Sequence, residues 1–129
     1  MGQRLGHKVC FAAHEDQDYD FIASWIVGDE RHFAPVQLKE VVPVERNPQA
    51  SIEAILAGLA KYTDSDELTV AIHLNQKGRF EPSLLEVPEL RIGSLWVFGS
   101  TAADQSLWAL WGNFTKSEPY GTQFSYPEA

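Results

Sequence analysis

The chain has 129 residues, enough for one domain (1–129), and its 44% hydrophobic, 12% aromatic and 22% charged residues exclude a disordered tail or a disulfide-rich secreted module. Eighteen acidic residues stand against ten Lys and Arg, which gives a formal charge of −8. Because nucleic-acid-binding proteins gain much of their non-specific affinity from basic side chains on phosphates, this balance excludes a broadly basic DNA-binding surface.

The first third of the chain predicts three strands. Val9–Ala13 is apolar on both faces, which is typical of an interior strand. Tyr19–Val27 and Phe33–Val42 are rich in aromatic and β-branched residues, and Gly28-Asp29-Glu30-Arg31 between them has turn chemistry. These two longer runs predict a β-hairpin.

A helix is predicted over Pro48–Tyr62, with Asn47 as its N-cap and Pro48 at the first helical position, where its missing N–H costs nothing. The apolar residues of this helix form one stripe: Ile52, Ile55, Leu56 and Leu59. Leu68–Asn75 is apolar and β-branched, which predicts a central strand. The helix before it allows this strand to run parallel to a strand of the hairpin.

The remainder of the chain is less regular. Residues 76–93 predict a loop with one helical turn around Ser83–Glu86, and Ser94–Gly99 and Leu107–Phe114 predict two further strands. The tail after Lys116 is expected to be irregular. The predicted fold class is therefore α/β, a mixed β-sheet of five or six strands in which a β-hairpin is followed by a crossover helix.

The hairpin brings three polar side chains together. A turn centred on Asp29-Glu30 places Asp20 opposite Lys39, whereas a turn centred on Gly28-Asp29 places Asp20 opposite Gln37. All three share one face in both registers, and an odd-sized loop moves Asp20 to the other face. A carboxylate and an amide oxygen suit Mg²⁺, and a neighbouring Lys can orient a metal-bound water for attack on phosphorus.

Asp20-Phe21-Ile22 and Val36-Gln37-Leu38-Lys39 resemble the signature of the PD-(D/E)xK, or restriction endonuclease-like, nuclease superfamily, in the variant where Gln replaces the acidic residue. The resemblance implies an α-β-β-β-α-β core, which the predicted elements follow without the leading helix. It also implies Mg²⁺ as cofactor and nucleic-acid phosphodiesters as substrate. By position, Asp20, Gln37 and Lys39 are the catalytic residues; Asp20, Gln37 and the Leu38 carbonyl bind the metal, and Lys39 positions the water.

Other interpretations of these residues stay open. Asp20 and Lys39 also fit a cross-strand ion pair on a solvated face. The polar loop before Asp20 either supplies further metal ligands or is a solvated acidic segment. Its candidate ligands are His14, Glu15, Asp16 and Asp18. Glu40 is expected on the opposite face from the motif. The alternative function is a non-catalytic homodimeric or partner-binding module of the same fold.

Trp96, Phe98, Trp108 and Trp111 form the most aromatic part of the chain. A groove that stacks nucleic-acid bases on aromatic rings also needs basic side chains for the phosphates. No Lys or Arg lies between Arg91 and Lys116, so this part of the chain lacks them. Core packing or a homodimer face is expected instead, the latter through Trp96, Trp108 and Trp111. His73 lies in an apolar strand and is expected to be a hydrogen-bonded core residue.

We find no signal for export and no candidate membrane helix in the sequence. The apolar run after the basic N-terminus is too short for a signal peptide. No apolar run approaches the roughly 20 residues that a membrane helix needs. We therefore expect a cytoplasmic location, with no membrane partner.

Overall fold

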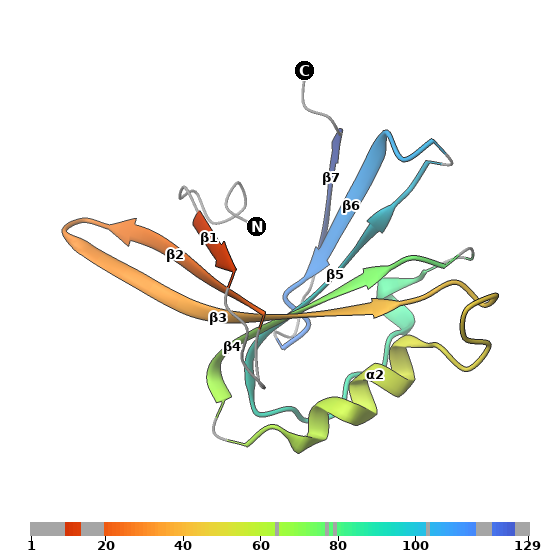
Figure 1. The fold of residues 1–129 in the computed structure, drawn as a ribbon, viewed down its shortest axis with the longest axis horizontal. Helices are drawn as coiled ribbons and strands as arrows, with labels where there is room; N and C mark the ends of the chain where they lie inside the picture. Colours follow the sequence, from red (N-terminus) through yellow and green to blue (C-terminus); the bar gives the residue numbers. More distant parts are fainter. Residues whose placement is uncertain are drawn as a thin grey trace.

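The structure is a computed structural model that describes residues 10–13, 20–63, 65–76, 78, 80–102, 104–115 and 120–125. It contains one sheet of seven strands whose spatial order follows the chain, β1 to β7 (Figure 1). The strands are β1 Cys10–Ala13, β2 Phe21–Val27, β3 Glu30–Val41, β4 Ser65–Leu74, β5 Ile92–Ser100, β6 Leu107–Gly112 and β7 Tyr120–Ser125. The helical segments are α2 Ile52–Gly58, and the 3₁₀ turns η1 Leu59–Lys61 and η2 Pro82–Leu84.

The sheet is mixed, as predicted. β1, β2 and β3 form an antiparallel meander, and α2 then carries the chain to β4, which runs parallel to β3. β5 is parallel to β4, and β6 and β7 return antiparallel. The predicted α/β class, the hairpin and the crossover helix are confirmed, with β4 at the centre of the sheet.

Two predictions about strands are wrong. β1 lies at the edge of the sheet and not inside it. The prediction failed because an apolar composition indicates that both faces of a strand are buried, but does not indicate whether the strand has one neighbour or two. The tail contains β7, which pairs with β6 along its whole length. Gly121 permits this close approach, since a Cβ there would lie 2.8 Å from Cδ1 of Trp111.

The helix begins later than predicted. Ser51 is the N-cap, and its hydroxyl accepts a hydrogen bond of 3.0 Å from the Ala54 amide. Asn47, the predicted cap, instead accepts a bond of 2.9 Å from the Gln49 amide within a turn. The helical segment is therefore α2 followed by η1, which together end at Lys61.

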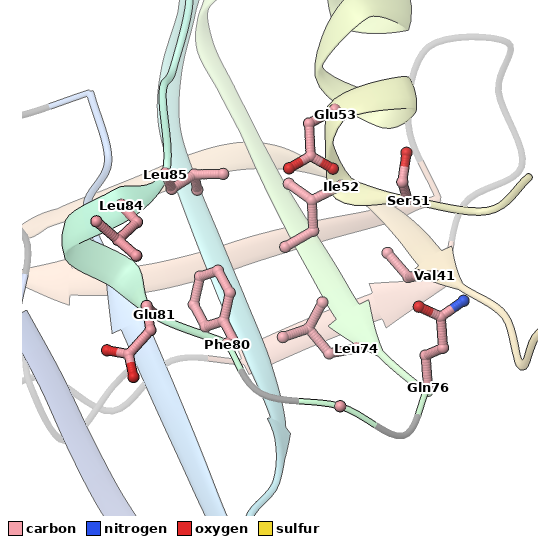
Figure 2. A pocket seen from close by; sticks show the side chains of 11 residues that line it. Val41, Ser51, Ile52, Glu53, Leu74, Gln76, Phe80, Glu81, Leu84 and Leu85 are labelled. Atoms are coloured by element: carbon pink, nitrogen blue, oxygen red, sulfur yellow. The ribbon is translucent and has the colours of Figure 1, made fainter.

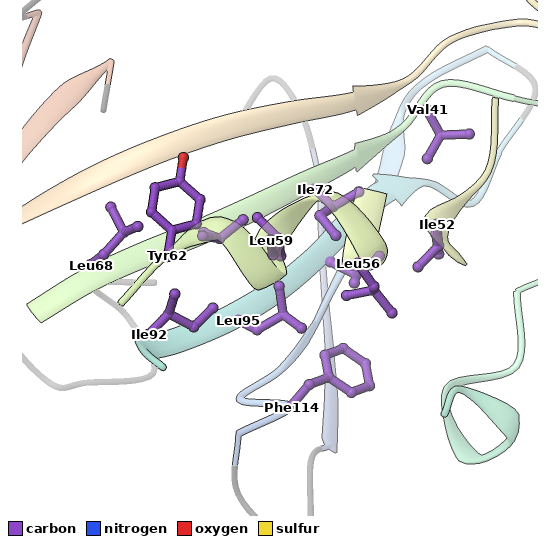
Figure 3. Packing of buried hydrophobic residues seen from close by; sticks show 12 residues of the cluster. Val41, Ile52, Leu56, Leu59, Tyr62, Leu68, Ile72, Ile92, Leu95 and Phe114 are labelled. Atoms are coloured by element: carbon purple, nitrogen blue, oxygen red, sulfur yellow. The ribbon is translucent and has the colours of Figure 1, made fainter. Parts of the chain in front are cut away.

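The core lies between α2 and one face of the sheet, which we call the helix face. The predicted stripe is confirmed, because Ile52, Leu56 and Leu59 are buried there and Ile55 packs against them. They meet apolar side chains of the central strands (Figure 3), which include Val70, Ile72, Leu95 and Val97. Within the described residues, no helix has the length and hydrophobicity needed to span a membrane.

Candidate functional site

The register of the β2–β3 hairpin decides where Asp20 lies. Val27 pairs with Glu30 around a two-residue turn, and Gly28 in that turn has a φ of +62°, a conformation that favours glycine. The last pair is Phe21 with Val36. Asp20 therefore lies next to Gln37, as in the second of the two predicted registers, and the register that opposes Asp20 to Lys39 is wrong.

The Asp20 carboxylate prolongs the hydrogen-bond ladder beyond the end of β2. The Asp20 amide donates to the Val36 carbonyl at 2.8 Å, and Asp20 Oδ2 accepts from the Leu38 amide at 3.0 Å. The carboxylate thus occupies the place of a strand carbonyl. Because the N–H and C=O of a strand residue point to the same neighbour, the Leu38 carbonyl also points to the Asp20 side of β3.

Gln37, the residue before Leu38 on β3, supplies a second oxygen. Gln37 pairs with Val70 of β4 and so belongs to the helix face. Its Oε1 atom is buried and accepts no hydrogen bond from any described residue. A buried polar oxygen without a partner costs about 1–3 kcal/mol, so an electropositive group is expected to face it. Asp20, Gln37 and the Leu38 carbonyl together offer hard oxygen ligands from two adjacent strands, which is a donor set suited to Mg²⁺.

Lys39 lies one step further along the same face. It pairs with Ile72, two residues beyond Gln37, and its side chain is half-buried. No ion pair joins Lys39 to Asp20, and among the described residues none joins Lys39 to any other carboxylate. The interpretation of Asp20 and Lys39 as a cross-strand ion pair is therefore wrong, and the ammonium is available for another negative group.

The other predicted polar residues are placed as follows. Glu40 pairs with His73 on the face opposite the helix, as expected, and Oε2 of Glu40 accepts from the Asn75 side chain at 2.9 Å. The His73 ring is half-buried and stacks on Phe98 at 5.1 Å between ring centroids. The candidate ligands of the acidic loop, His14, Glu15, Asp16 and Asp18, lie outside the described residues.

The tryptophans do not form one surface. Trp96 pairs with Ala71, and Trp108 with Ser100, on the face opposite the helix. Trp111 pairs with Val97 on the helix face, where its ring meets Phe80 edge-on at 4.9 Å. A homodimer face that uses all three rings at once is therefore incompatible with the sheet, because strand alternation sends them to opposite sides.

The structure also contains a pocket that the sequence did not predict. It has a volume of about 350 Å³ and lies on the helix face beside the start of α2 (Figure 2). Val41, Ile52, Leu74, Phe80 and Leu85 give it apolar walls, and Glu53 stands at its border. We call it the α2 pocket. Phe80 lies in the segment predicted as loop, and it packs against the core together with Leu85, Val87 and Leu90, whose apolar side chains were the local signal of buried structure.

Comparison of the chain with protein-family models, with curated proteins and with solved structures found no match. Among the described residues, no group of three or more His, Cys, Asp and Glu side chains is placed to hold a metal ion. The candidate metal site therefore depends on one carboxylate together with amide and backbone oxygens. Mg²⁺ accepts such a set because it keeps several of its water ligands.

Proposed function

We propose that the protein is a Mg²⁺-dependent, restriction endonuclease-like domain that hydrolyses nucleic-acid phosphodiesters at Asp20, Gln37 and Lys39. The observation that carries the proposal is the buried Oε1 of Gln37, which accepts no hydrogen bond from any described residue and belongs to the residue before Leu38, whose amide donates to the Asp20 carboxylate. Such an oxygen is unfavourable in a merely structural strand, whereas it is useful as a cation ligand. The Leu38 carbonyl lies on the same edge.

Each residue has a distinct task in this proposal. Asp20, Gln37 and the Leu38 carbonyl hold Mg²⁺, which when bound lowers the pKa of a coordinated water and stabilises negative charge on the phosphate oxygens. The Leu38 amide fixes the Asp20 carboxylate by its 3.0 Å hydrogen bond. Lys39 has no carboxylate partner among the described residues, so its ammonium orients the attacking water or contacts the phosphate.

The chain topology supports the same proposal. Three antiparallel strands, a helix and a parallel fourth strand follow one another from Cys10 to Leu74. This is the order of the β-β-β-α-β part of the core that the resemblance implies. The candidate residues adjoin the hairpin of its second and third strands: Asp20 directly precedes β2, and Gln37 and Lys39 belong to β3.

A cleavage assay tests the proposal. Single-stranded, double-stranded and branched DNA are incubated with the protein and Mg²⁺ or Mn²⁺, and products are separated by size. We expect metal-dependent cleavage that Lys39→Ala lowers by about 100-fold or more, a typical loss for a proton-transfer residue. Lys61→Ala, which removes an exposed lysine at the end of η1, is the matched control. Equal activity in Lys39→Ala and the control would refute the assignment.

The alternative, a non-catalytic partner-binding or homodimeric module, is favoured by a different observation. Toward its turn the β2–β3 hairpin exposes Phe33 by 60% and Ile26 by 53%. Exposed apolar side chains of this kind are common at protein interfaces. Sedimentation of the wild type and of the Ile26→Ser, Phe33→Ser double variant separates the two functions. A dimer that the double variant dissociates, without any cleavage activity, supports the alternative.

A further inference from the structure

We propose that the α2 pocket binds an unpaired nucleobase that carries an exocyclic amine, on a nucleotide whose phosphate lies at Lys39. The position of the phosphate in this inference rests on the proposed function, whereas the binding of the base is argued from the pocket alone. The inference names a substrate class: single-stranded nucleic acid with adenine or another amino-substituted base beside the reacting phosphate.

The walls of the pocket suit a flat, largely apolar ring. Its volume of about 350 Å³ falls in the range of small-molecule sites. Phe80 supplies an aromatic surface, and Ile52, Leu74 and Leu85 supply aliphatic ones (Figure 2). Phe80 is itself held by ring contacts with Trp111 at 4.9 Å and Phe114 at 6.4 Å. A stacking surface is thus preformed, and stacking on aromatic rings is how proteins hold unpaired bases.

The wall between β4 and α2 is also fixed before any ligand binds. The Gln76 side-chain amide donates to the Val42 carbonyl at 3.1 Å and to the Ala50 carbonyl at 3.3 Å. These bonds tie the segment after β4 to the segment before α2. Since both amide hydrogens are used, the Gln76 side chain is held in one position at the pocket, and its carbonyl oxygen remains an acceptor.

Glu53 gives the pocket its chemical preference. Figure 2 shows its carboxylate pointing toward the pocket from the first turn of α2. The carboxylate makes no hydrogen bond or ion pair with any described residue, and among the described lining residues the charged side chains are Glu53 and Glu81. A carboxylate is an acceptor only, so it selects a base with an amino group, such as adenine or cytosine, over one that presents a carbonyl.

The proposed catalytic residues lie within one nucleotide of the pocket. Val41, which lines the pocket, is two residues after Lys39 on β3 and shares its face. Two residues of strand span about 7 Å. A phosphate at Lys39 and a base in the pocket are therefore bridged by one sugar. A base held in this way cannot pair or stack within a duplex, so the substrate must be unpaired at this nucleotide.

Calorimetric titration with a matched pair of nucleosides tests base binding without metal or cleavage. We expect saturable binding of adenosine, and at least about tenfold weaker binding of inosine, which has a carbonyl in place of the amine. Glu53→Ala should lower adenosine affinity by about tenfold, whereas Glu89→Ala, which removes an exposed acid outside the pocket, should not. Leu85→Trp, which fills the pocket, should abolish binding.

A second titration separates this inference from the proposed catalytic function. Adenosine 5′-monophosphate should bind more tightly than adenosine in the wild type, and Lys39→Ala should remove that difference. Equal affinity for adenosine and inosine, or no binding of either, overturns the base pocket even if the protein cleaves DNA. Selective adenosine binding by a protein without nuclease activity upholds the base pocket and refutes only the proposed catalysis.

Discussion

Gln37 places a polar amide on the strand face that meets the core. Its ladder partner Val70 is fully buried, and Val41 further along β3 is buried as well. An amide oxygen without a partner in such a place lowers stability, and proteins retain this kind of defect mainly where it serves function. If Gln37 binds a metal ion, a substitution that removes its amide oxygen should raise the stability of the fold and lower metal affinity, and both effects can be measured.

Replacing Gln37 by Met should stabilise the fold and remove the metal site. Met has a similar length and no unpaired oxygen, so we expect the free energy of unfolding to rise by about 1 kcal/mol in the absence of metal. Urea denaturation with and without Mg²⁺ checks this, because Mg²⁺ should stabilise the wild type and not the variant. A loss of stability in Gln37→Met would show that the amide oxygen already has a favourable partner.

Asp20 has a structural and a chemical task that two substitutions separate. Asp20→Asn keeps an oxygen acceptor for the Leu38 amide, so stability should change by less than about 0.5 kcal/mol, while metal affinity should fall with the lost charge. Asp20→Ala also removes the acceptor and should cost about 1 kcal/mol. The measurements are urea denaturation and Mn²⁺ titration. Equal Mn²⁺ affinity in wild type and Asp20→Asn contradicts the assigned ligand.

At the scale of elements, the start of α2 illustrates how local signals compete. Asn47 and Ser51 are both good N-cap residues, and Pro48 favours the earlier start. The Asn47 side chain is used within a turn by the Gln49 amide, whereas the Ser51 hydroxyl reaches Ala54. The apolar stripe begins at Ile52, directly after Ser51. Packing against the sheet therefore favours the later start.

Ser51→Ala should consequently destabilise the protein more than Asn47→Ala. Loss of an N-cap costs about 1 kcal/mol, with a range of about 0.5–2 kcal/mol, whereas loss of a turn hydrogen bond on an exposed residue should cost less. Thermal or urea unfolding of the two variants provides the comparison. The opposite order of stabilities would indicate that the helix begins at Pro48 in solution.

The sequence predicted those parts of the fold that local chemistry determines. The hairpin followed from Gly28-Asp29 between two β-rich runs, and the helix stripe from its spacing. The exact register did not follow, because turns centred one residue apart keep Asp20 and Gln37 on one face. β7 was missed because Pro119, Gly121 and Pro127 gave the tail the composition of a loop, and the α2 pocket because its walls come from four separate segments.

At the scale of the whole molecule, the charge of −8 limits how the protein can hold a polyanion. Acidic residues spread over the surface repel a long duplex, so the proposed function requires affinity from the cation, Lys39 and base contacts at few nucleotides. This balance favours short contacts with a flexible strand over the broad electrostatic contact typical of duplex-binding proteins.

A weak salt dependence and a preference for single strands should follow. We expect single-stranded DNA to be cleaved at least about tenfold faster than a duplex of the same sequence. With about two phosphates contacted, log affinity should fall with log salt with a slope of about −1.4. Fluorescence anisotropy measured from about 50 to 200 mM salt gives the slope. A steep slope or a preference for duplex would point to a basic surface that the described residues lack.

The most direct test of the account is where a divalent cation binds. Paramagnetic Mn²⁺ broadens amide resonances close to it, so a titration of ¹⁵N-labelled protein locates the ion residue by residue. We predict that the Leu38 backbone and Gln37 side-chain amide signals broaden first, at sub-stoichiometric Mn²⁺, and that Asp20→Asn removes this effect. First broadening at another acidic segment, such as Asp66-Glu67, with Leu38 and Gln37 unaffected, would contradict the proposed metal site and the nuclease function built on it.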